Sequence, residues 1–330
     1  MRTPRAAGVP ERSSSHSGGH DRVRRARASL RRRTPARILR APTRNSVDAD
    51  AGHPLRSSPM HPITVRTMKF DVPSADEFHP LYIAGNAALS YSHTALGLYV
   101  AYLEPFMVKT LRKVLGQIRD DTLREEVDRF CRQEAQHYQQ HIDFNKVVIA
   151  HGYPGLEQRI DTLQRDFDRF LADATDRFCV GYAEGFESYT TQSALQLLAY
   201  GHYDHRRTTR SFGDLFKWHM LEEIEHRNVA FDLYQHLYGD YFFRVRMCWM
   251  AQSHMLRFFR DCMEIMSRTD VPRHGDRCRI STKWKLLLAN NQLGMRVRSM
   301  LPGYSPHKYR LPANIAELSA QFTQRAVSVR

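Results

Sequence analysis

From about residue 82 onward, apolar residues recur at spacings of three and four, which is the period of one face of an α-helix. Residues 80–115 show this pattern, and Pro105 within it predicts a kink or a break because proline lacks the backbone donor. A second helix is expected over residues 120–150, ending before Gly152. Strand-like alternation is hard to find in this part of the chain, so the pattern predicts an all-α protein.

Two more long helices are predicted before residue 240. Residues 157–200 form the third stretch, with a break expected near Gly181 and Gly185, and residues 211–237 form the fourth. Further helices are expected over residues 241–266, 282–300 and 313–322, with a polar loop at 270–279. The expected architecture is therefore a four-helix bundle with additional C-terminal helices.

The positive charge of the chain is concentrated at its beginning. The protein has a formal net charge of +14 at pH 7, and residues 1–60 contribute +10 of it, with 14 Arg, no Lys and 4 acidic residues. This leader is poor in large apolar residues, so we expect it to be disordered and to precede a bundle domain at residues 61–330. A nucleic-acid-binding arm, a transit peptide and a mistaken upstream start, with Met60 or Met68 as the true first residue, are the alternatives.

Neither secretion nor membrane insertion is indicated. The leader lacks the apolar core of a secretory signal, and no segment has the roughly 18 uninterrupted apolar residues of a membrane span. We therefore expect a soluble, cytoplasmic protein with no membrane partner, and a nucleic-acid partner would rest on the leader alone. The five cysteines include no Cys-x-x-Cys pair, which favours buried, reduced thiols over disulfides or a thiolate zinc site.

The polar residues that interrupt the apolar faces form a repeated pattern. A Glu-x-x-His motif occurs at residues 134–137 and again at residues 223–226. A single glutamate, Glu104 or Glu187, precedes each motif by 30 or 36 residues, on the helix before it. Glu and His at i and i+3 project from the same side of a helix, and two such helices with two single glutamates provide the ligands of a dinuclear site in a ferritin-like bundle. Because polar residues on a core face are costly unless paired or metal-bound, the doubled pattern predicts a di-metal centre.

Neighbouring residues leave part of the assignment open. Glu222 and Glu184 compete with the glutamates that we favour, and His141 is either a further ligand, a hydrogen-bonding neighbour or a core-edge histidine. His219, four residues before Glu223, is a candidate additional ligand. The candidate metal ligands are Glu104, Glu134, His137, Glu187, His219, Glu223 and His226, and the candidate catalytic residues among them are Glu134, Glu187 and Glu223. Four other histidines are expected to be structural or surface residues, namely His93, His236, His254 and His274.

These motifs resemble those of a known family. Residues 132–137 (Arg-Gln-Glu-Ala-Gln-His) and residues 222–232 (Glu-Glu-Ile-Glu-His-Arg-Asn-Val-Ala-Phe-Asp) resemble the bacterial family of predicted metal-dependent hydrolases, over about residues 62–312. The resemblance implies a metal-dependent enzyme. The spacing of His219, Glu223 and His226 also resembles that of the di-iron arylamine N-oxygenases, which implies an additional histidine ligand.

The proportion of carboxylate to imidazole suits iron, or manganese, better than zinc. We therefore expect two metal ions, with iron favoured, and O2 activation on a small organic substrate as the leading hypothesis. Hydrolysis by metal-activated water is the first alternative, and iron storage in a ferritin-like bundle is the second. The sequence does not indicate which small molecule is the substrate, and a homodimer is compatible with it.

Overall fold

The computed structural model describes residues 63–327 of the chain. These residues belong to one compact unit, in which helices are joined by turns and loops and no strand occurs. The all-α class is thereby confirmed. The expectations for residues 1–60 lie outside the described residues.

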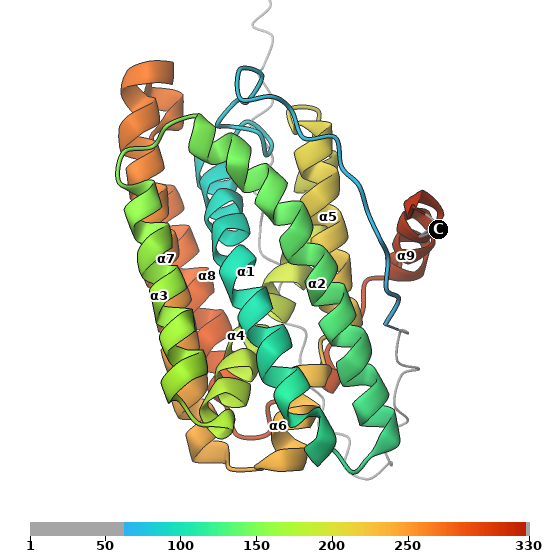
Figure 1. The fold of residues 1–330 in the computed structure, drawn as a ribbon. Helices are drawn as coiled ribbons and strands as arrows, with labels where there is room; N and C mark the ends of the chain where they lie inside the picture. The colour runs from blue at the N-terminus through green and yellow to red at the C-terminus, as the bar shows by residue number, and fades with distance from the viewer. Residues whose placement is uncertain (1–62, 328–330) are drawn as a thin grey trace, which may run out of the picture. The chain divides into compact units, whose positions relative to one another are not determined.

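The helices account for most of the unit (Figure 1). Several of them begin at a side chain that caps the first turn. Asp120 accepts a hydrogen bond from the backbone N–H of Leu123 at 3.1 Å, and Ser281 accepts one from that of Trp284 at 3.4 Å. The α-helices are α1 (Ala87–Val114), α2 (Asp121–Ala150), α3 (Leu156–Asp173), α4 (Asp176–Ala199), α5 (Arg210–Glu225), α6 (Val229–Leu237), α7 (Tyr241–His274), α8 (Thr282–Met300) and α9 (Ile315–Arg325). Short 3-10 segments occur at Leu115–Gln117, His202–Asp204, Asp276–Cys278 and Pro306–Lys308.

The third predicted stretch is two helices, α3 and α4. The break lies at Thr175, whose hydroxyl accepts a hydrogen bond from the backbone N–H of Phe178 at 3.2 Å and so starts α4. The predicted break near Gly181 and Gly185 is wrong, because both glycines lie inside α4. A Cβ atom on Gly185 would lie 2.8 Å from the Cα atom of Cys248, so this glycine allows α4 and α7 to approach closely.

The fourth predicted helix is also divided. α5 ends at Glu225, and His226 leaves helical geometry with φ −97° and ψ 8°. The backbone N–H of Val229 donates to the carbonyl of His226 at 3.0 Å, and α6 begins there. The prediction of one continuous helix over residues 211–237 is therefore wrong, and His226 lies at a helix end.

Two further boundaries differ from the prediction. α1 continues through Pro105, so the helix does not break there, although the missing N–H of proline leaves the carbonyl of Ala101 without its helical partner. α7 extends to His274, so the first part of the predicted polar loop is helical. Gly275, at φ 87°, ends this helix with a backbone conformation that favours glycine.

The helices pack around α1, which lies between α2 and α3 in Figure 1. α1 makes its most extensive contacts with α2 and also contacts α7, α3 and α4, while α4 packs most closely on α7. α9 contacts α5 at the edge of the unit. Because α1, α2, α4 and α5 surround a shared interior, side chains from all four can meet there.

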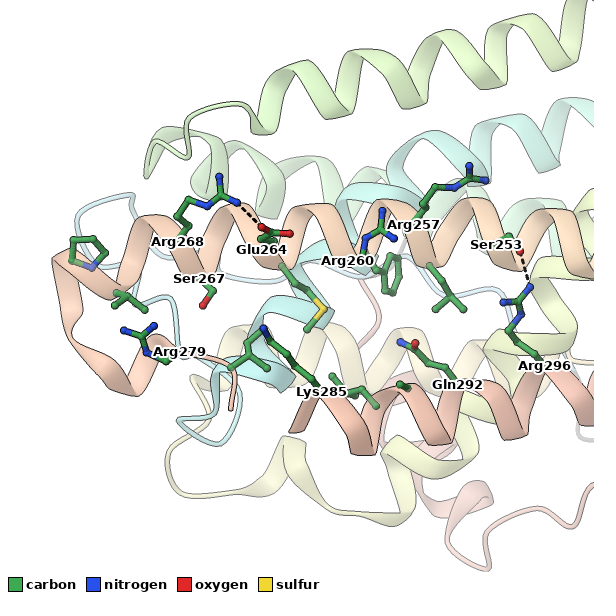
Figure 2. A pocket seen from close by; sticks show the side chains of 18 residues that line it. Ser253, Arg257, Arg260, Glu264, Ser267, Arg268, Arg279, Lys285, Gln292 and Arg296 are labelled. Carbon is green, nitrogen blue, oxygen red and sulfur yellow. Dashed lines mark hydrogen bonds and ion pairs between the residues drawn. The ribbon is translucent and has the colours of Figure 1, made fainter. Parts of the chain in front are cut away.

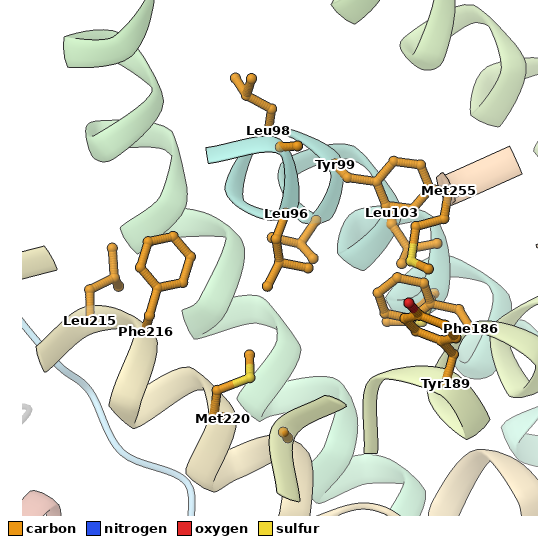
Figure 3. Close-up of a cluster of buried hydrophobic side chains, with 14 of the residues drawn as sticks. Leu96, Leu98, Tyr99, Leu103, Phe186, Tyr189, Leu215, Phe216, Met220 and Met255 are labelled. Atoms are coloured by element: carbon orange, nitrogen blue, oxygen red, sulfur yellow. The ribbon is translucent and has the colours of Figure 1, made fainter. Parts of the chain in front are cut away.

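Large apolar side chains fill this interior. Leu103 on α1, Phe186 on α4, Phe216 on α5 and Met255 on α7 are among the buried residues drawn in Figure 3. None of the helices within residues 63–327 is both long and apolar enough to cross a lipid bilayer. All five cysteines are buried and free, as predicted, at Cys131, Cys179, Cys248, Cys262 and Cys278.

Candidate metal centre

The seven candidate ligands come together in the interior of the helical unit, and each is at most 2 % exposed. α1 carries Glu104, α2 carries the first Glu-x-x-His motif, α4 carries Glu187, and α5 carries His219 and Glu223. His226 follows directly at the end of α5. Four helices that are far apart in sequence thus present seven polar side chains to one buried region.

The seven side chains form two adjoining groups. Within each group, one ligand-type atom from every residue lies within 4.8 Å of the others. The first group is Glu104, His137 and His219, and the second is Glu134, Glu187, Glu223 and His226. This is the size of cluster that can hold one cation in each group.

Two glutamates lie between the groups. Glu134 places Oε1 3.3 Å from Nε2 of His226 and Oε2 3.7 Å from Nδ1 of His137. Glu223 places Oε1 3.2 Å from Nε2 of His219 and 3.7 Å from Nε2 of His226. Each of these carboxylates therefore reaches a histidine of both groups.

The remaining two glutamates are each close to one group. Oε1 of Glu104 lies 3.8 Å from Nδ1 of His137 and 4.0 Å from Nδ1 of His219. Oε2 of Glu187 lies 3.6 Å from Nε2 of His226. These contacts are longer than hydrogen bonds, so they leave space between the atoms.

Most of these polar atoms are buried and lack a hydrogen-bond partner. Both carboxylate oxygens of Glu104, Glu134 and Glu187 are in this state, as are Nδ1 of His137 and Nε2 of His226. Burying a charged oxygen without a partner is expensive, and native proteins avoid it unless a cation is bound. The residues present therefore fit a pair of metal ions, which would supply the missing partners.

Hydrogen bonds from neighbouring residues orient two of the histidines. Nε2 of His137 donates to Oε2 of Glu222 at 3.1 Å, which leaves Nδ1 facing the cluster. Nδ1 of His226 donates to Oε1 of Gln133 at 3.0 Å, which leaves Nε2 facing it. An outer hydrogen bond of this kind fixes the tautomer and the ring orientation of a metal-binding histidine.

The two orienting residues are themselves held in place. The amide nitrogen of Gln133 donates to the carbonyl of Thr64 and to Oε2 of Glu225, both at 3.0 Å, so its oxygen must face His226. Glu222 accepts hydrogen bonds from Nε1 of Trp218 at 2.8 Å and from Nη1 of Arg66 at 2.9 Å.

Electrostatics within the cluster are strongly perturbed. Burial, together with Glu134, raises the pKa of Glu104 well above its usual value. Burial, together with Glu223, does the same to the pKa of Glu187. Burial would also raise the pKa of Glu223, but its contacts with His219 and His226 outweigh this and hold it well below the usual range.

The pKa of His137 shows that the cluster favours a positive charge. Burial lowers the pKa of this histidine, but the neighbouring carboxylates of Glu134 and Glu222 outweigh burial and hold the pKa well above the usual value. The carboxylates thus attract a proton to a ring buried among them. The same field would attract a metal cation.

The structure shows where the three residues lie whose roles the sequence left open. Glu184, one turn before Glu187, pairs with Nη1 of Arg244 at 2.9 Å and lies in neither group. Glu222 faces Arg66 and His137 instead of joining a group. Nε2 of His141 lies 2.8 Å from Nδ1 of His219, so His141 is a hydrogen-bonding neighbour.

Three histidines that were expected to be structural do have ordinary partners. Nδ1 of His93 lies 2.7 Å from the carbonyl of Leu89, Nε2 of His236 accepts from the backbone N–H of Arg119, and His254 pairs with Asp166. His274 differs, because it forms a third ligand-type group with His151 and Asp270. Sequence reasoning missed this group, although Asp270 and His274 have i, i+4 spacing.

Sequence reasoning also missed Arg66 and Gln133. Gln133 directly precedes Glu134, and this position beside the motif is the one feature of the sequence that could have pointed to it. Arg66 lies in an irregular segment without periodicity, so the sequence carried no indication that it would reach Glu222.

A large groove lies between α7 and α8, away from these ligands. It has a volume of about 1030 Å³, and none of its lining residues is a candidate ligand. Figure 2 shows its basic side chains, including Arg257, Lys285 and Arg296, along the two helices. The groove is therefore distinct from the buried centre.

Comparison with known proteins places the chain in a family. A family described as predicted metal-dependent hydrolase matches residues 64–310, which is well over half of the chain. The chain belongs to this family. Its match spans α1 to α8 and thus every candidate ligand of the buried centre. Searches of curated proteins and of solved structures give no match.

Proposed function

We propose that this protein is a metal-dependent hydrolase that acts on a small molecule at a dinuclear centre. The observation that carries the proposal is the convergence of seven buried ligand-type side chains, many of whose oxygens and nitrogens lack a partner. The choice of hydrolysis rests on the family to which the chain belongs.

Each residue then has a role that follows from its place. Glu134 and Glu223 lie close to histidines of both groups, so both carboxylates would help to hold the pair of metal ions. Glu104 and Glu187 would each help to hold the ion of the group that they lie beside. His137, His219 and His226 would complete the two sets.

Two bound metal ions would supply a water of lowered pKa and a Lewis acid for the leaving oxygen. The protein itself would position the metal ligands and enclose the site. Glu222 and Gln133 hold the rings of His137 and His226, and the packed helices exclude bulk water. Such a dry, fixed site strengthens every electrostatic interaction within it.

Two buried glutamates one turn apart on α4 provide a matched test. In Glu187→Gln, we expect metal bound per chain to fall and hydrolysis of p-nitrophenyl esters and phosphoesters to fall at least about 100-fold, since a charged ligand is lost. In Glu184→Gln, we expect the metal content to stay the same, because Glu184 faces Arg244. Equal metal content in the two variants would contradict the assignment of the centre.

O2 activation is a second candidate, favoured by the ligand set. Four carboxylates and three imidazoles with no thiolate are typical of iron or manganese more than of zinc. Protein loaded anaerobically with Fe(II) would then consume about one O2 per pair of irons on exposure to air. Turnover with zinc and no consumption of O2 with iron would exclude this candidate.

Iron storage is the third candidate, and it predicts a different stoichiometry. A storage protein takes up many iron atoms per chain, whereas an enzyme centre saturates near two. Titration with Fe(II), read as iron retained after gel filtration, separates the two outcomes.

A further inference from the structure

The third group of ligand-type side chains, His151, Asp270 and His274, lies where α2 and α7 end. Its centre is Asp270, which is fully buried on α7. The hydroxyls of Tyr91 and Tyr153 both donate to Oδ2 of Asp270, each at 2.9 Å. A tyrosine hydroxyl beside a carboxylate oxygen acts as the donor, because the phenol carries the proton and the carboxylate oxygen accepts it. Their hydrogen bonds leave Oδ1 of Asp270 to face the other members of the group.

Two histidines face this carboxylate from different helices. His151 caps the C-terminus of α2, and its Nε2 lies 3.3 Å from Oδ1 of Asp270. His274 lies one turn after Asp270 on α7, and its ring stacks on that of His151 with centroids 5.8 Å apart. Nε2 of His274 is buried and has no hydrogen-bond partner. One atom from each of the three residues lies within 4.8 Å of the others.

The spacing of these atoms matches the edge of a metal coordination shell. Ligands at about 2.0–2.1 Å from a tetrahedral ion are about 3.3–3.4 Å from one another. The 3.3 Å hydrogen bond between Nε2 of His151 and Oδ1 of Asp270 has this length, so these two atoms are already spaced as two ligands of one ion would be. Two tyrosine hydroxyls on the far oxygen of Asp270 are the kind of outer hydrogen bonds that orient a ligating carboxylate.

We propose that His151, Asp270 and His274 form a mononuclear site for a divalent transition metal ion such as zinc, separate from the buried dinuclear centre. Two histidines and one carboxylate supply three ligands, and a water would occupy the fourth position because both histidines are partly exposed. His151 follows His137 by 14 residues on α2, or about 21 Å along the helix, so the two sites share no ligand. A bound ion would join the end of α2 to the end of α7.

His79 lies beside the group and provides a matched control. Its ring is 6.1 Å from that of His274. The backbone N–H of Leu81 donates to Nδ1 of His79, so the neutral ring carries its proton on Nε2 and has no lone pair free for a metal. Replacing His79 therefore removes an adjacent imidazole without removing a proposed ligand.

The test measures zinc retained by the full-length protein after metal loading and desalting. We expect His274→Ala and His151→Ala each to retain one equivalent fewer than the wild type, and His79→Ala to match the wild type. The difference of one equivalent holds whatever number of zinc ions the dinuclear centre takes up. By competition with a chromophoric chelator, the lost site should bind at least about 10-fold more weakly in each variant, because a ligand contributes no less than an outer partner.

Two results would overturn the proposal. One is equal zinc retention by the wild type, His274→Ala and His151→Ala. The other is loss of an equivalent in His79→Ala, which would show that the exposed imidazoles bind zinc non-specifically. His274→Ala removes ring contacts with His151 and His79 but no hydrogen bond of Nε2, so we expect this variant to fold. Circular dichroism of each variant verifies this.

Discussion

The carboxylate of Glu222 accepts a hydrogen bond from the ring of His137, with 3.1 Å between Nε2 and Oε2. An ionised carboxylate only accepts, so the shared proton belongs to Nε2 of the histidine. The other ring nitrogen, Nδ1, then faces Glu104 and Glu134 at 3.8 and 3.7 Å. The sequence left Glu222 only as an alternative metal ligand. In the structure, Glu222 orients the ring of His137, which is a proposed ligand.

Arg66 holds Glu222 in this position, and its removal should destabilise the protein. Its Nη1 lies 2.9 Å from Oε1 of Glu222, and its Nη2 lies 2.7 Å from Oε1 of Glu225, with all three side chains buried. Arg66→Ala removes a buried cation that is paired with two buried carboxylates, so we expect a loss of about 3–5 kcal/mol in the free energy of unfolding. Urea denaturation at pH 7 measures it.

The control for Arg66 is an exposed ion pair. Lys146 lies 2.8 Å from Asp143 at the surface, and Lys146→Ala should change the free energy of unfolding by less than about 1 kcal/mol. Similar losses in the two variants would mean that the burial of Arg66 does not matter.

Gln133 should control metal affinity without being a ligand. Its oxygen accepts the Nδ1 proton of His226, and Gln133→Ala removes that acceptor. We expect the dissociation constant for metal at the buried centre to rise about 10–100-fold, with the number of sites unchanged. Gln139, which is exposed on the same helix, gives the matched variant Gln139→Ala, for which affinity should stay at the wild-type value. An unchanged dissociation constant for metal in Gln133→Ala would contradict the proposal that Gln133 orients His226.

Gly185 should be intolerant of a side chain because α4 and α7 touch there. A Cβ atom would lie 2.8 Å from the Cα atom and 2.9 Å from the backbone nitrogen of Cys248, so the helices must separate. We expect Gly185→Ala to destabilise the protein by about 1–3 kcal/mol. Gly294 lies in α8 with no atom within 4 Å of an added Cβ, and Gly294→Ala should stabilise by about 0.5–1 kcal/mol. Thermal unfolding of both variants gives the comparison, and the same sign for both would contradict it.

His93 should make stability depend on pH in the acid range. Burial is the main cause that lowers the pKa of His93 to about 4. Because the unfolded chain has a pKa near 6.5 at this residue, it binds more protons than the folded protein between pH 6.5 and 4. The contribution of His93 is therefore fully present above pH 6.5 and is lost as the pH falls toward 4.

The size of this effect follows from the shift. Between pH 7 and pH 5, His93 should lower the free energy of unfolding by about 2 kcal/mol. In His93→Gln, this part of the pH dependence should disappear, so the difference between wild type and variant should shrink on acidification. Urea titrations at both pH values measure it, and a difference that is independent of pH would show that His93 is not buried in its neutral form.

Several features of the fold could be predicted from short stretches of sequence. The predicted helix at residues 282–300 coincides with α8, and the one at 120–150 agrees with α2 to within one residue. Both begin at a side chain, Ser281 or Asp120, that caps a backbone N–H three residues later. Thr175 is a cap of the same kind and marks a break that the periodicity alone did not reveal.

Other features needed the tertiary structure. Gly181 and Gly185 resemble helix breakers in sequence, yet they lie inside α4 because α7 packs against them. No side chain caps the start of α6 after the turn at His226, so the local sequence does not indicate this turn. Such choices depend on contacts between residues distant in sequence, which outweigh the modest local preferences of the backbone.

The same division applies to the buried centre. Spacing along the helices determined that Glu134 and His137, or Glu223 and His226, would leave the chain on one side, because i and i+3 positions are neighbours on a helix. Only the packed helices decided that these pairs would meet Glu104 and Glu187, that Arg66 and Gln133 would hold them in place, and that Glu184 would face Arg244 instead. Local hydrogen bonding fixes the direction of a side chain relative to its own helix, whereas its neighbours across the interior depend on how the helices pack.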